Sequence, residues 1–477
     1  MDPIIADATL ILPPEPPPPP TAGPGDWIRR NLLRSRADAV VTVVAAVVVG
    51  YALYRLGRFV VDTGRWTIVQ RNLTTYLVGR FPRGELWRVG LALCAMAAYG
   101  GLLAGFIHQR QVHAGRPVAT GPLPKRLADV ALRLWPLLLG VALLLSFTRT
   151  IGPWLLVLLV LASGVVGRLL GGVLPRRSTL ALVLGGIAMS VLLVMLLTDA
   201  IGWDEWGGMM LNVVLAAAGI SLSFPLGVLL ALGRQAGRRA DSIGGGVAAA
   251  VFCAAAPALL LVRRGFEVGD GISWALAAAI VAVALAGFRL GRRSTLPLVR
   301  VLSVVYIEFF RGVPLYVLLF LGYLGLRFFL PAGAETPGLV VRATVVFTIF
   351  TAAYIAEIVR GGLQSLPRGQ TEAAQALGLS PVKTNLLIVL PQALRNVIPA
   401  IVGQFISLFK DTTLAGAAIP LLDMLGVGEA VTAQPDFRGQ ALHAESFAFV
   451  MFLFWVGCIT MSRESQRLER KLGVGTR

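Results

Sequence analysis

The sequence predicts an all-α membrane protein, a polytopic bundle of about twelve transmembrane helices. Of its 477 residues, 56% are hydrophobic and 14% are charged, and the mean hydropathy is +0.75. This apolar content exceeds what a soluble core requires. Apolar runs of about 17–25 residues, long enough to cross the hydrocarbon layer, recur along the chain. Basic residues gather in short clusters at the ends of these runs, which is typical of cytoplasmic segments.

The apolar runs give the order of the predicted spans. Five precede residue 200 and seven follow it, and the runs at 134–148 and 246–262 are short for a span. The predicted spans are 38–54, 86–107, 134–148, 154–170, 179–197, 208–232, 246–262, 272–289, 313–330, 342–362, 396–420 and 446–461.

Residues 1–36 are predicted to form a disordered, proline-rich cytoplasmic tail. The stretch ILPPEPPPPPTAGPG (11–25) favours polyproline II structure and contact with solvent. Asp2 and Asp7 stand where a secretory signal has basic residues, so we expect no cleaved signal. Binding of the proline run to an SH3-like domain is the alternative to a flexible tail.

Membrane topology explains the net charge of +18 better than nucleic-acid binding does. A cytoplasmic N-terminus followed by alternating spans also places the C-terminus in the cytoplasm. The loop at 55–85 is an exception, because it contains six arginines but is assigned to the outer face. Either the charge rule is weak at this loop or the first span is wrongly assigned. The basic clusters assigned to the inner face are Arg29, Arg30, Arg34 and Arg36, Lys125 and Arg126, Arg176 and Arg177, Arg238 and Arg239, Arg292 and Arg293, and the tail at 463–477.

A polar segment at 370–391, which we call the elbow segment, predicts two helices joined by a sharp turn. Gln370 to Leu377 is rich in good helix formers. Gly378 is able to adopt the positive φ that commonly follows the end of a helix. Ser380 and Pro381 then supply an N-cap and a favoured first helical residue.

Two further features of the elbow segment concern its end and its surface. We expect Pro391 to end the second helix, because proline lacks the backbone N–H that a helix interior needs. Ala373, Ala374 and Ala376 are small, so they leave the backbone of the first helix close to its surface and favour docking of a protein partner. An ordinary amphipathic connector between two spans is the alternative.

The elbow segment resembles the EAA signature of permease subunits of ABC importers. That signature is E-A-A, three residues, G, nine residues and I-x-L-P, and the matching residues are Glu372, Ala373, Ala374, Gly378, Ile388, Leu390 and Pro391. Three flanking segments are similar to the amino-acid branch of the family, the histidine/glutamine type. They are VVYIEFFRGVPLYV (304–317), AAYIAEIVRGGLQSLPRGQ (352–370) and FISLFKDTTLAG (405–416). The resemblance covers roughly 206–470.

The resemblance implies a type I ABC-importer permease core at 206–470, in a bacterial inner membrane. It also implies uptake of polar or general L-amino acids, with an ATPase dimer gripping the elbow segment from the cytoplasm. A periplasmic amino-acid-binding protein and a sister permease, or a second copy of this chain, are the other expected partners besides lipid. The five predicted spans at 37–200 resemble the N-terminal extension of the general L-amino-acid subtype.

The chain departs from the family pattern in one place. The usual cytoplasmic linker begins at Leu232-Gly233-Arg234 but resumes only at 290–294. An inserted block at about 234–290 therefore separates the two parts. It contains two predicted spans, so all downstream segments keep their expected side.

The sequence predicts no enzyme site on this chain. None of its four lysines follows a glycine, so the phosphate-binding motif G-x-x-x-x-G-K-[ST] is absent and ATP must be bound by a partner subunit. His108, His113 and His443 lack carboxylate or cysteine partners at metal-ligand spacing, so we predict no metal or cofactor.

Ionisable residues near span ends are the candidates for the transport pathway and its gates, because charge is costly within lipid. Glu308 with Arg311, and Glu357 with Arg360, stand three residues apart and are expected to form intrahelical ion pairs; direct contact with substrate is the alternative. Lys410, Asp411 and Thr412 interrupt an apolar run. They predict either a polar break that lines the pathway or outer gate, or simply the end of a helix.

Two other classes of function remain open from the residues. An ion-coupled secondary transporter predicts inverted repeats and a charged pair at the membrane midplane, and neither is evident in the sequence. A membrane scaffold without transport would make the match to the EAA signature accidental. The identity of the protein partners distinguishes all three classes.

Overall fold

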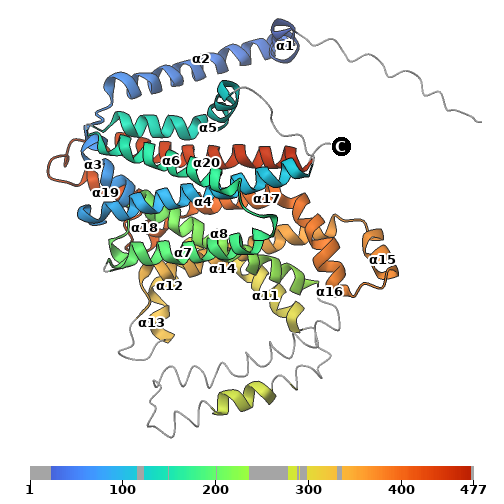
Figure 1. Ribbon diagram of the computed structural model, residues 1–477. Helices are drawn as coiled ribbons and strands as arrows, with labels where there is room; N and C mark the ends of the chain where they lie inside the picture. The colour runs from blue at the N-terminus through green and yellow to red at the C-terminus, as the bar shows by residue number, and fades with distance from the viewer. Residues whose placement is uncertain are drawn as a thin grey trace, which may run out of the picture. The chain divides into compact units, whose positions relative to one another are not determined.

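The described residues form helices throughout, in the computed structural model shown in Figure 1. The structure describes residues 23–114, 123–148, 150–199, 201–235, 278–286, 289, 298–329 and 336–473. Within them, the only β-type pairing is an isolated bridge between Gly208 and Asp423. The chain divides into two compact units, residues 1–65 and 66–477, and each is described by itself.

The first unit contains two helices, α1 (Pro24–Asn31) and α2 (Arg36–Arg58), and a π-helical turn at Phe59–Thr63. The α1 helix lies within the stretch for which we predicted disorder; Pro24 in its first turn favours helix initiation. The Ser35 side chain caps α2 by accepting a hydrogen bond from the Asp38 N–H at 3.0 Å. Within the first unit, no residue of α2 is buried.

The second unit begins with five helices that precede the predicted permease core. The α4 and α6 helices pack with their backbones in close contact, through the spacings Gly101-xxx-Gly105 and Gly167-xxx-Gly171. A Cβ atom added at Gly101 would lie 2.0 Å from the Gly164 carbonyl oxygen. Small residues at this spacing are typical of close helix pairs in membranes. The five helices are α3 (Thr67–Val78), α4 (Leu86–His113), α5 (Leu123–Ser146), α6 (Gly152–Gly171) and α7 (Thr179–Thr198).

The remaining helices surround α14, the most buried of the long helices described. Its small residues Ala352, Ala353 and Ala356 are fully buried, and Gly227 of α8 lies directly against Ile355. The helices of this part are α8 (Gly208–Arg234), α11 (Leu298–Gly312), α12 (Leu315–Leu324), α13 (Leu326–Phe329), α14 (Leu339–Gln364), α15 (Gly369–Ala376), α16 (Pro381–Thr384), α17 (Leu390–Asp411), α18 (Leu414–Ala418), α19 (Met424–Thr432) and α20 (His443–Leu472).

The described part of the chain contains nine helices that are long and apolar enough to cross a membrane, or ten with one bent pair. Ten of the twelve predicted spans overlap these helices. The span at 246–262 lies outside the described residues, and the span at 272–289 is described only at 278–286 and 289. The chain is therefore an all-α polytopic membrane protein, and the count of twelve stays a prediction.

Two predicted spans have different limits from those expected. The span at 313–330 is the second half of the bent pair, because Pro314 caps α12 and the chain turns by 102° from α11. The span at 396–420 ends early, since α17 stops at Asp411 and the rest forms the short helix α18. Proline explains the first difference, and the polar residues after Phe409 explain the second.

Short helices close one end of the second unit, opposite α15 and α16 (Figure 1). The α3 helix, within the loop at 55–85, packs against α8, α19 and the start of α20. Asn72 accepts a hydrogen bond from Gln434 at 2.9 Å, and Tyr76 bonds Ser446 at 2.6 Å. Arg71 pairs with Asp436. Burial and pairing therefore hold α3, with Arg71 of the arginine-rich loop, against α8, α19 and α20.

We predict that Gly101→Val separates α4 from α6, because a side chain there overlaps the backbone of α6. Overpacking of this kind costs about 1–3 kcal/mol. Gly100→Val is the matched control, since a Cβ at that neighbouring position meets nothing within 4 Å. Thermal unfolding in detergent, followed by size-exclusion chromatography, should show a lower midpoint for Gly101→Val alone. Equal midpoints for the two variants would contradict the glycine contact.

Candidate functional site

The first half of the elbow segment ends in a tight helix-terminating motif. The α15 helix stops at Ala376, and Gly378 adopts a left-handed conformation with φ of +76°. The Gly378 N–H donates to the Gln375 carbonyl at 2.9 Å, and the Leu379 N–H donates to the Ala374 carbonyl at 3.1 Å. These two bonds form a Schellman motif, which satisfies carbonyl groups left free at the helix end. The predicted role of Gly378 as the turn residue is confirmed.

The second half of the elbow segment begins as predicted but does not end as predicted. Ser380 accepts a hydrogen bond from the Lys383 N–H at 3.4 Å, and Pro381 is in the first turn of α16. A π-helical turn at Asn385–Val389 then leads directly into α17. Our prediction that Pro391 ends the helix is wrong. Pro391 lies in the first turn of α17, where the helix tolerates a residue without an N–H.

The elbow segment, whose helices α15 and α16 project from one end of the second unit (Figure 1), has a surface with a marked apolar part. Glu372 and Ala373 are exposed, whereas Ala374 is 2% exposed and packs inward. Ile388 and Leu390 are half-buried and Pro391 is exposed. Sequence reasoning missed the apolar residues of this surface, whose exposed fractions are 82% for Leu377, 62% for Val382, 52% for Leu386 and 67% for Leu387. An unpaired apolar surface of this kind is typical of an interaction site.

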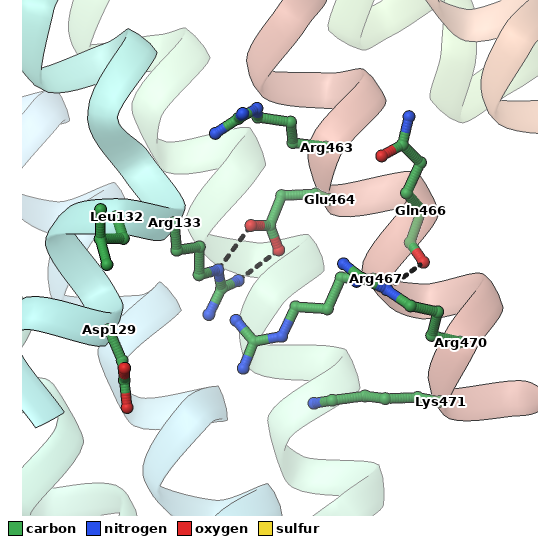
Figure 2. Close-up of a pocket in the computed structure, with 9 residues that line it drawn as sticks. All are labelled: Asp129, Leu132, Arg133, Arg463, Glu464, Gln466, Arg467, Arg470 and Lys471. Atoms are coloured by element: carbon green, nitrogen blue, oxygen red, sulfur yellow. Dashed lines mark hydrogen bonds and ion pairs between the residues drawn. The ribbon is translucent and has the colours of Figure 1, made fainter. Parts of the chain in front are cut away.

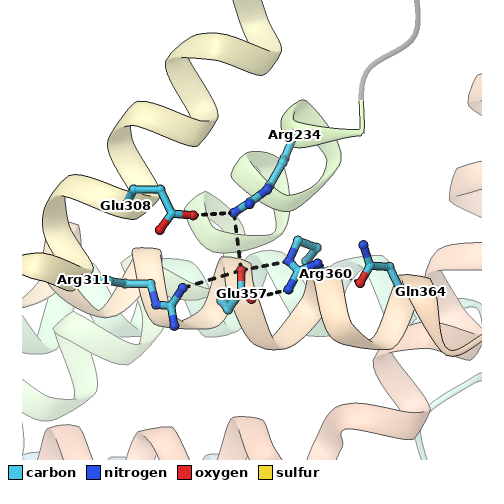
Figure 3. Close-up of polar contacts among 6 residues, drawn as sticks. All are labelled: Arg234, Glu308, Arg311, Glu357, Arg360 and Gln364. Carbon is cyan, nitrogen blue, oxygen red and sulfur yellow. Dashed lines mark hydrogen bonds and ion pairs between the residues drawn. The ribbon is translucent and has the colours of Figure 1, made fainter.

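An ion-pair cluster joins α8, α11 and α14, as Figure 3 shows. Glu357 is at its centre and accepts hydrogen bonds from both Nε (2.9 Å) and Nη2 of Arg360. Arg234 donates to Glu308 at 3.0 Å and to Glu357 at 3.5 Å. Arg311 lies 3.8 Å from Glu357. One carboxylate is thus shared by three arginines from three helices.

The ion pairs of Glu308 and Glu357 in this cluster agree only in part with the predicted pairs. The pair of Glu357 with Arg360 is confirmed, but Glu308 forms its ion pair with Arg234 instead of with Arg311. Sequence reasoning did not single out Arg234, because its partners are 74 and 123 residues away. A polar cavity of about 420 Å³ adjoins the cluster and is lined by Arg234, Gln235, Arg300, Arg360 and Gln364.

The third group of candidate residues lies at the opposite end of the unit, where α17 ends. Asp411 is the last residue of α17, and Thr412 is fully buried. The Asn212 side chain donates to the Thr412 hydroxyl at 3.0 Å and accepts from the Met424 N–H at 2.8 Å. Thr412 therefore helps to join α8, α17 and α19. The structure brings the two glutamate and arginine pairs together but leaves Lys410, Asp411 and Thr412 apart from them.

Comparison with known proteins identifies the family. Residues 276–474, which include the elbow segment, match the model of the family described as binding-protein-dependent transport system inner membrane component. The probable glutamine ABC transporter permease protein GlnM of Bacillus subtilis is 32% identical over 209 residues, which are 43% of this chain and 92% of GlnM. The chain belongs to this family of inner-membrane permeases. The resemblance based on the elbow segment is confirmed.

Two further relatives align with a larger part of the permease. The inner membrane amino-acid ABC transporter permease protein YhdY of Escherichia coli is 36% identical over 271 residues, 57% of each chain. The glutamate/glutamine/aspartate/asparagine transport system permease protein BztC of Rhodobacter capsulatus is 40% identical over 288 residues. Those residues are 57% of this permease and 65% of BztC. The permease thus aligns with less than two thirds of the length of either relative.

Asp423 is a buried acid of the permease that sequence reasoning missed. It is the N-cap of α19, accepts a hydrogen bond from the Gly426 N–H at 2.8 Å, and is fully buried. Its Oδ2 atom has no hydrogen-bond partner among the described residues. Burial raises the pKa of Asp423 to about 6, although hydrogen bonds from its neighbours oppose the shift. A sequence signal existed, since aspartate followed by an apolar helix is a common N-cap pattern.

We predict that Asp423 makes the stability of the permease depend on pH. Its folded-state pKa of about 6 lies above the ordinary value of 3.8, so the folded protein binds this proton more tightly than the unfolded chain does. The stabilising contribution is complete below pH 3.8 and is lost as the pH rises through 6. Thermal midpoints at pH 4 to 8 measure this slope. Asp423→Asn keeps a capping oxygen and should remove the slope; an unchanged slope would overturn the assignment.

We predict that Glu357→Gln destabilises the permease more than Glu308→Gln does. Glu357 is 24% exposed and shared by three arginines, so its loss costs about 1–3 kcal/mol. Glu308 is 55% exposed and has one ion-pair partner among the described residues, so its loss costs less than about 1 kcal/mol. Unfolding midpoints of the two variants in detergent provide the measurement. A larger effect at Glu308 would contradict the central position of Glu357.

Proposed function

We propose that this permease is the membrane subunit of an ABC importer that takes up polar L-amino acids, driven by a separate ATPase. The exposed elbow segment supports the proposal best, because it is a rigid two-helix projection with an apolar surface at one end of the bundle. The ATPase hydrolyses ATP, and this chain provides the path. No cofactor is required on the permease itself.

Coupling occurs through the elbow segment and the helices attached to it. The α15 helix follows α14 closely, and α16 continues through the π-helical turn into α17. Movement of a docked ATPase is therefore transmitted to two long helices of the core. Glu372 orients the segment on the ATPase surface, and Gly378 fixes the turn between its two helices. The ATPase must bind the inward and outward states with different affinity, since only differential affinity shifts the equilibrium.

The substrate class rests on the relatives and on the predicted extension. YhdY is named for amino acids and BztC for glutamate, glutamine, aspartate and asparagine. Polar L-amino acids are therefore the proposed cargo. The general L-amino-acid subtype is the finer proposal, supported by the helices described between residues 37 and 200.

We infer the remaining partners from the side of the membrane to which each end of the bundle is assigned. We place the elbow segment and both termini in the cytoplasm of a bacterium, and α3 and α19 toward the periplasm. A periplasmic binding protein delivers the amino acid at that outer end, and a sister permease or a second copy of this chain completes the path. Lys410, Asp411 and Thr412 then lie at the outer gate. Glu308, Arg311, Glu357 and Arg360 form an inner cluster that holds the helices around the path.

Gly378→Val tests the role of the elbow segment. Valine is strongly disfavoured at a φ of +76°, although no atom within 4 Å obstructs its Cβ, so the strain is confined to the turn. We expect normal membrane insertion, loss of the co-purifying ATPase and uptake of a labelled amino acid reduced at least about tenfold, which a disruption of about 1.4 kcal/mol suffices to produce. Gly378→Asn is the control, because asparagine tolerates this conformation.

A reconstitution experiment separates the importer from an ion-coupled secondary transporter. Uptake by the importer requires the ATPase in the same membrane, whereas a secondary transporter works without it when an ion gradient is present. Proteoliposomes that contain the permease alone, tested with and without a gradient, distinguish these classes. Gradient-driven uptake by the chain alone would overturn the proposed function.

A further inference from the structure

A second polar cavity lies far from the elbow segment along the chain, between α5 and the C-terminal turns of α20. Its volume is about 590 Å³, and Figure 2 shows its lining. Five lining residues are basic and two are acidic, so the cavity has an excess of positive charge. The lining residues are Asp129, Leu132, Arg133, Arg463, Glu464, Gln466, Arg467, Arg470 and Lys471.

The internal contacts of the cavity leave part of this positive charge uncompensated. Arg133 of α5 makes a bidentate ion pair with Glu464 of α20. Arg470 donates from Nε to the Gln466 carbonyl at 3.3 Å. Within the described residues, neither Arg467 nor Lys471 has an ion-pair partner. Figure 2 shows the side chains of both reaching from α20 toward α5. Together they provide donors suited to a phosphate group.

The cavity lies at the level where lipid headgroups are expected. The α20 helix has 30 residues and is therefore about 45 Å long, which exceeds the hydrocarbon layer of about 30 Å. Its last turns project beyond that layer, at the end that bears the elbow segment, because Arg395 of α17 donates to the Leu472 carbonyl. The ring centres of Trp135 and Trp455, on the same two helices, lie 6.0 Å apart, and tryptophan is enriched at membrane interfaces.

Apolar side chains continue the cavity toward the lipid. Leu132 lines the cavity and is 71% exposed, and Leu137 and Leu138 on the same helix are 44% and 47% exposed. The guanidinium of Arg463 lies 5.0 Å from the centre of the Trp135 ring, between the basic and the apolar parts. A ligand with a phosphate and acyl chains matches both parts, whereas a free anion matches only the basic part.

We propose that this cavity binds the phosphate headgroup of an anionic phospholipid of the inner leaflet. Arg467 and Lys471 contact the phosphate, Arg463 and Trp135 contact the glycerol region, and the acyl chains lie along the exposed leucines of α5. Basic cavities between transmembrane helices on the cytoplasmic side are suited to such headgroups. The bound lipid holds α5 against α20 and so links the predicted extension to the permease core.

Native mass spectrometry of the full-length permease with phosphatidylglycerol, cardiolipin or phosphatidylcholine tests the proposal. We expect the double substitution Arg467→Gln with Lys471→Gln to weaken retention of the two anionic lipids at least about tenfold, since each basic residue near a membrane contributes about a factor of five. Phosphatidylcholine should be retained weakly by both proteins. Equal retention of anionic lipid by the wild type and the double variant would overturn the proposal.

Two controls separate the headgroup site from other causes. Arg467→Lys with Lys471→Arg preserves the charge and should keep the lipid, whereas Arg177→Gln removes an exposed charge elsewhere and should have no effect. Inorganic phosphate provides the last comparison. If millimolar phosphate displaces the lipid or stabilises the lipid-free permease as strongly as phosphatidylglycerol does, the site takes a soluble anion and the lipid proposal fails.

Discussion

The close packing of α14 against α8 is the contact on which the rest of the permease depends. Three buried alanines of α14 and Gly227 of α8 bring the two backbones together, and Ile355 fills the space between them. Lipid is itself apolar, so the hydrophobic effect does not drive helices together within a membrane. Close contacts between small residues are therefore a main source of helix association. This contact also places Arg234 beside Glu357, so the inner ion-pair cluster depends on it.

The polar contacts that join the core helices are of two kinds. Ion pairs shared among α8, α11 and α14 join these helices on the side of the core that leads into the elbow segment. The junction of α8, α17 and α19 instead has neutral, buried hydrogen bonds, in which Asn212 connects Thr412 to the start of α19. Charged groups that are partly hydrated can exchange partners at modest cost, whereas a buried neutral network has few alternatives. The ion-pair cluster is therefore better able to rearrange than the junction at Thr412 is.

The sequence predicted features that depend on local backbone preferences. Gly378, Ser380 and Pro381 occupy the expected turn, cap and first helical turn, because nearest neighbours decide those conformations. Pro391 was misjudged because a preceding π-helical turn, which leaves no signal in composition, allows the helix to continue. The pairing of Arg234 with Glu308 and Glu357 depends on which helices become neighbours. One sequence without an alignment does not contain that information.

Helices α3, α4 and α7 of the second unit pack against the helices that follow residue 206. Val78, Phe81 and Ala92 share one buried cluster with Leu211 of α8 and Phe347 of α14. Glycines permit the closest approach: Gly79, with φ of +64°, lies directly against Gly207, where any side chain would collide with the opposing backbone. These helices thus contribute to burial of the first turns of α8, at the end opposite Arg234. The start of α8 is therefore held both by the glycine contact and by this buried cluster.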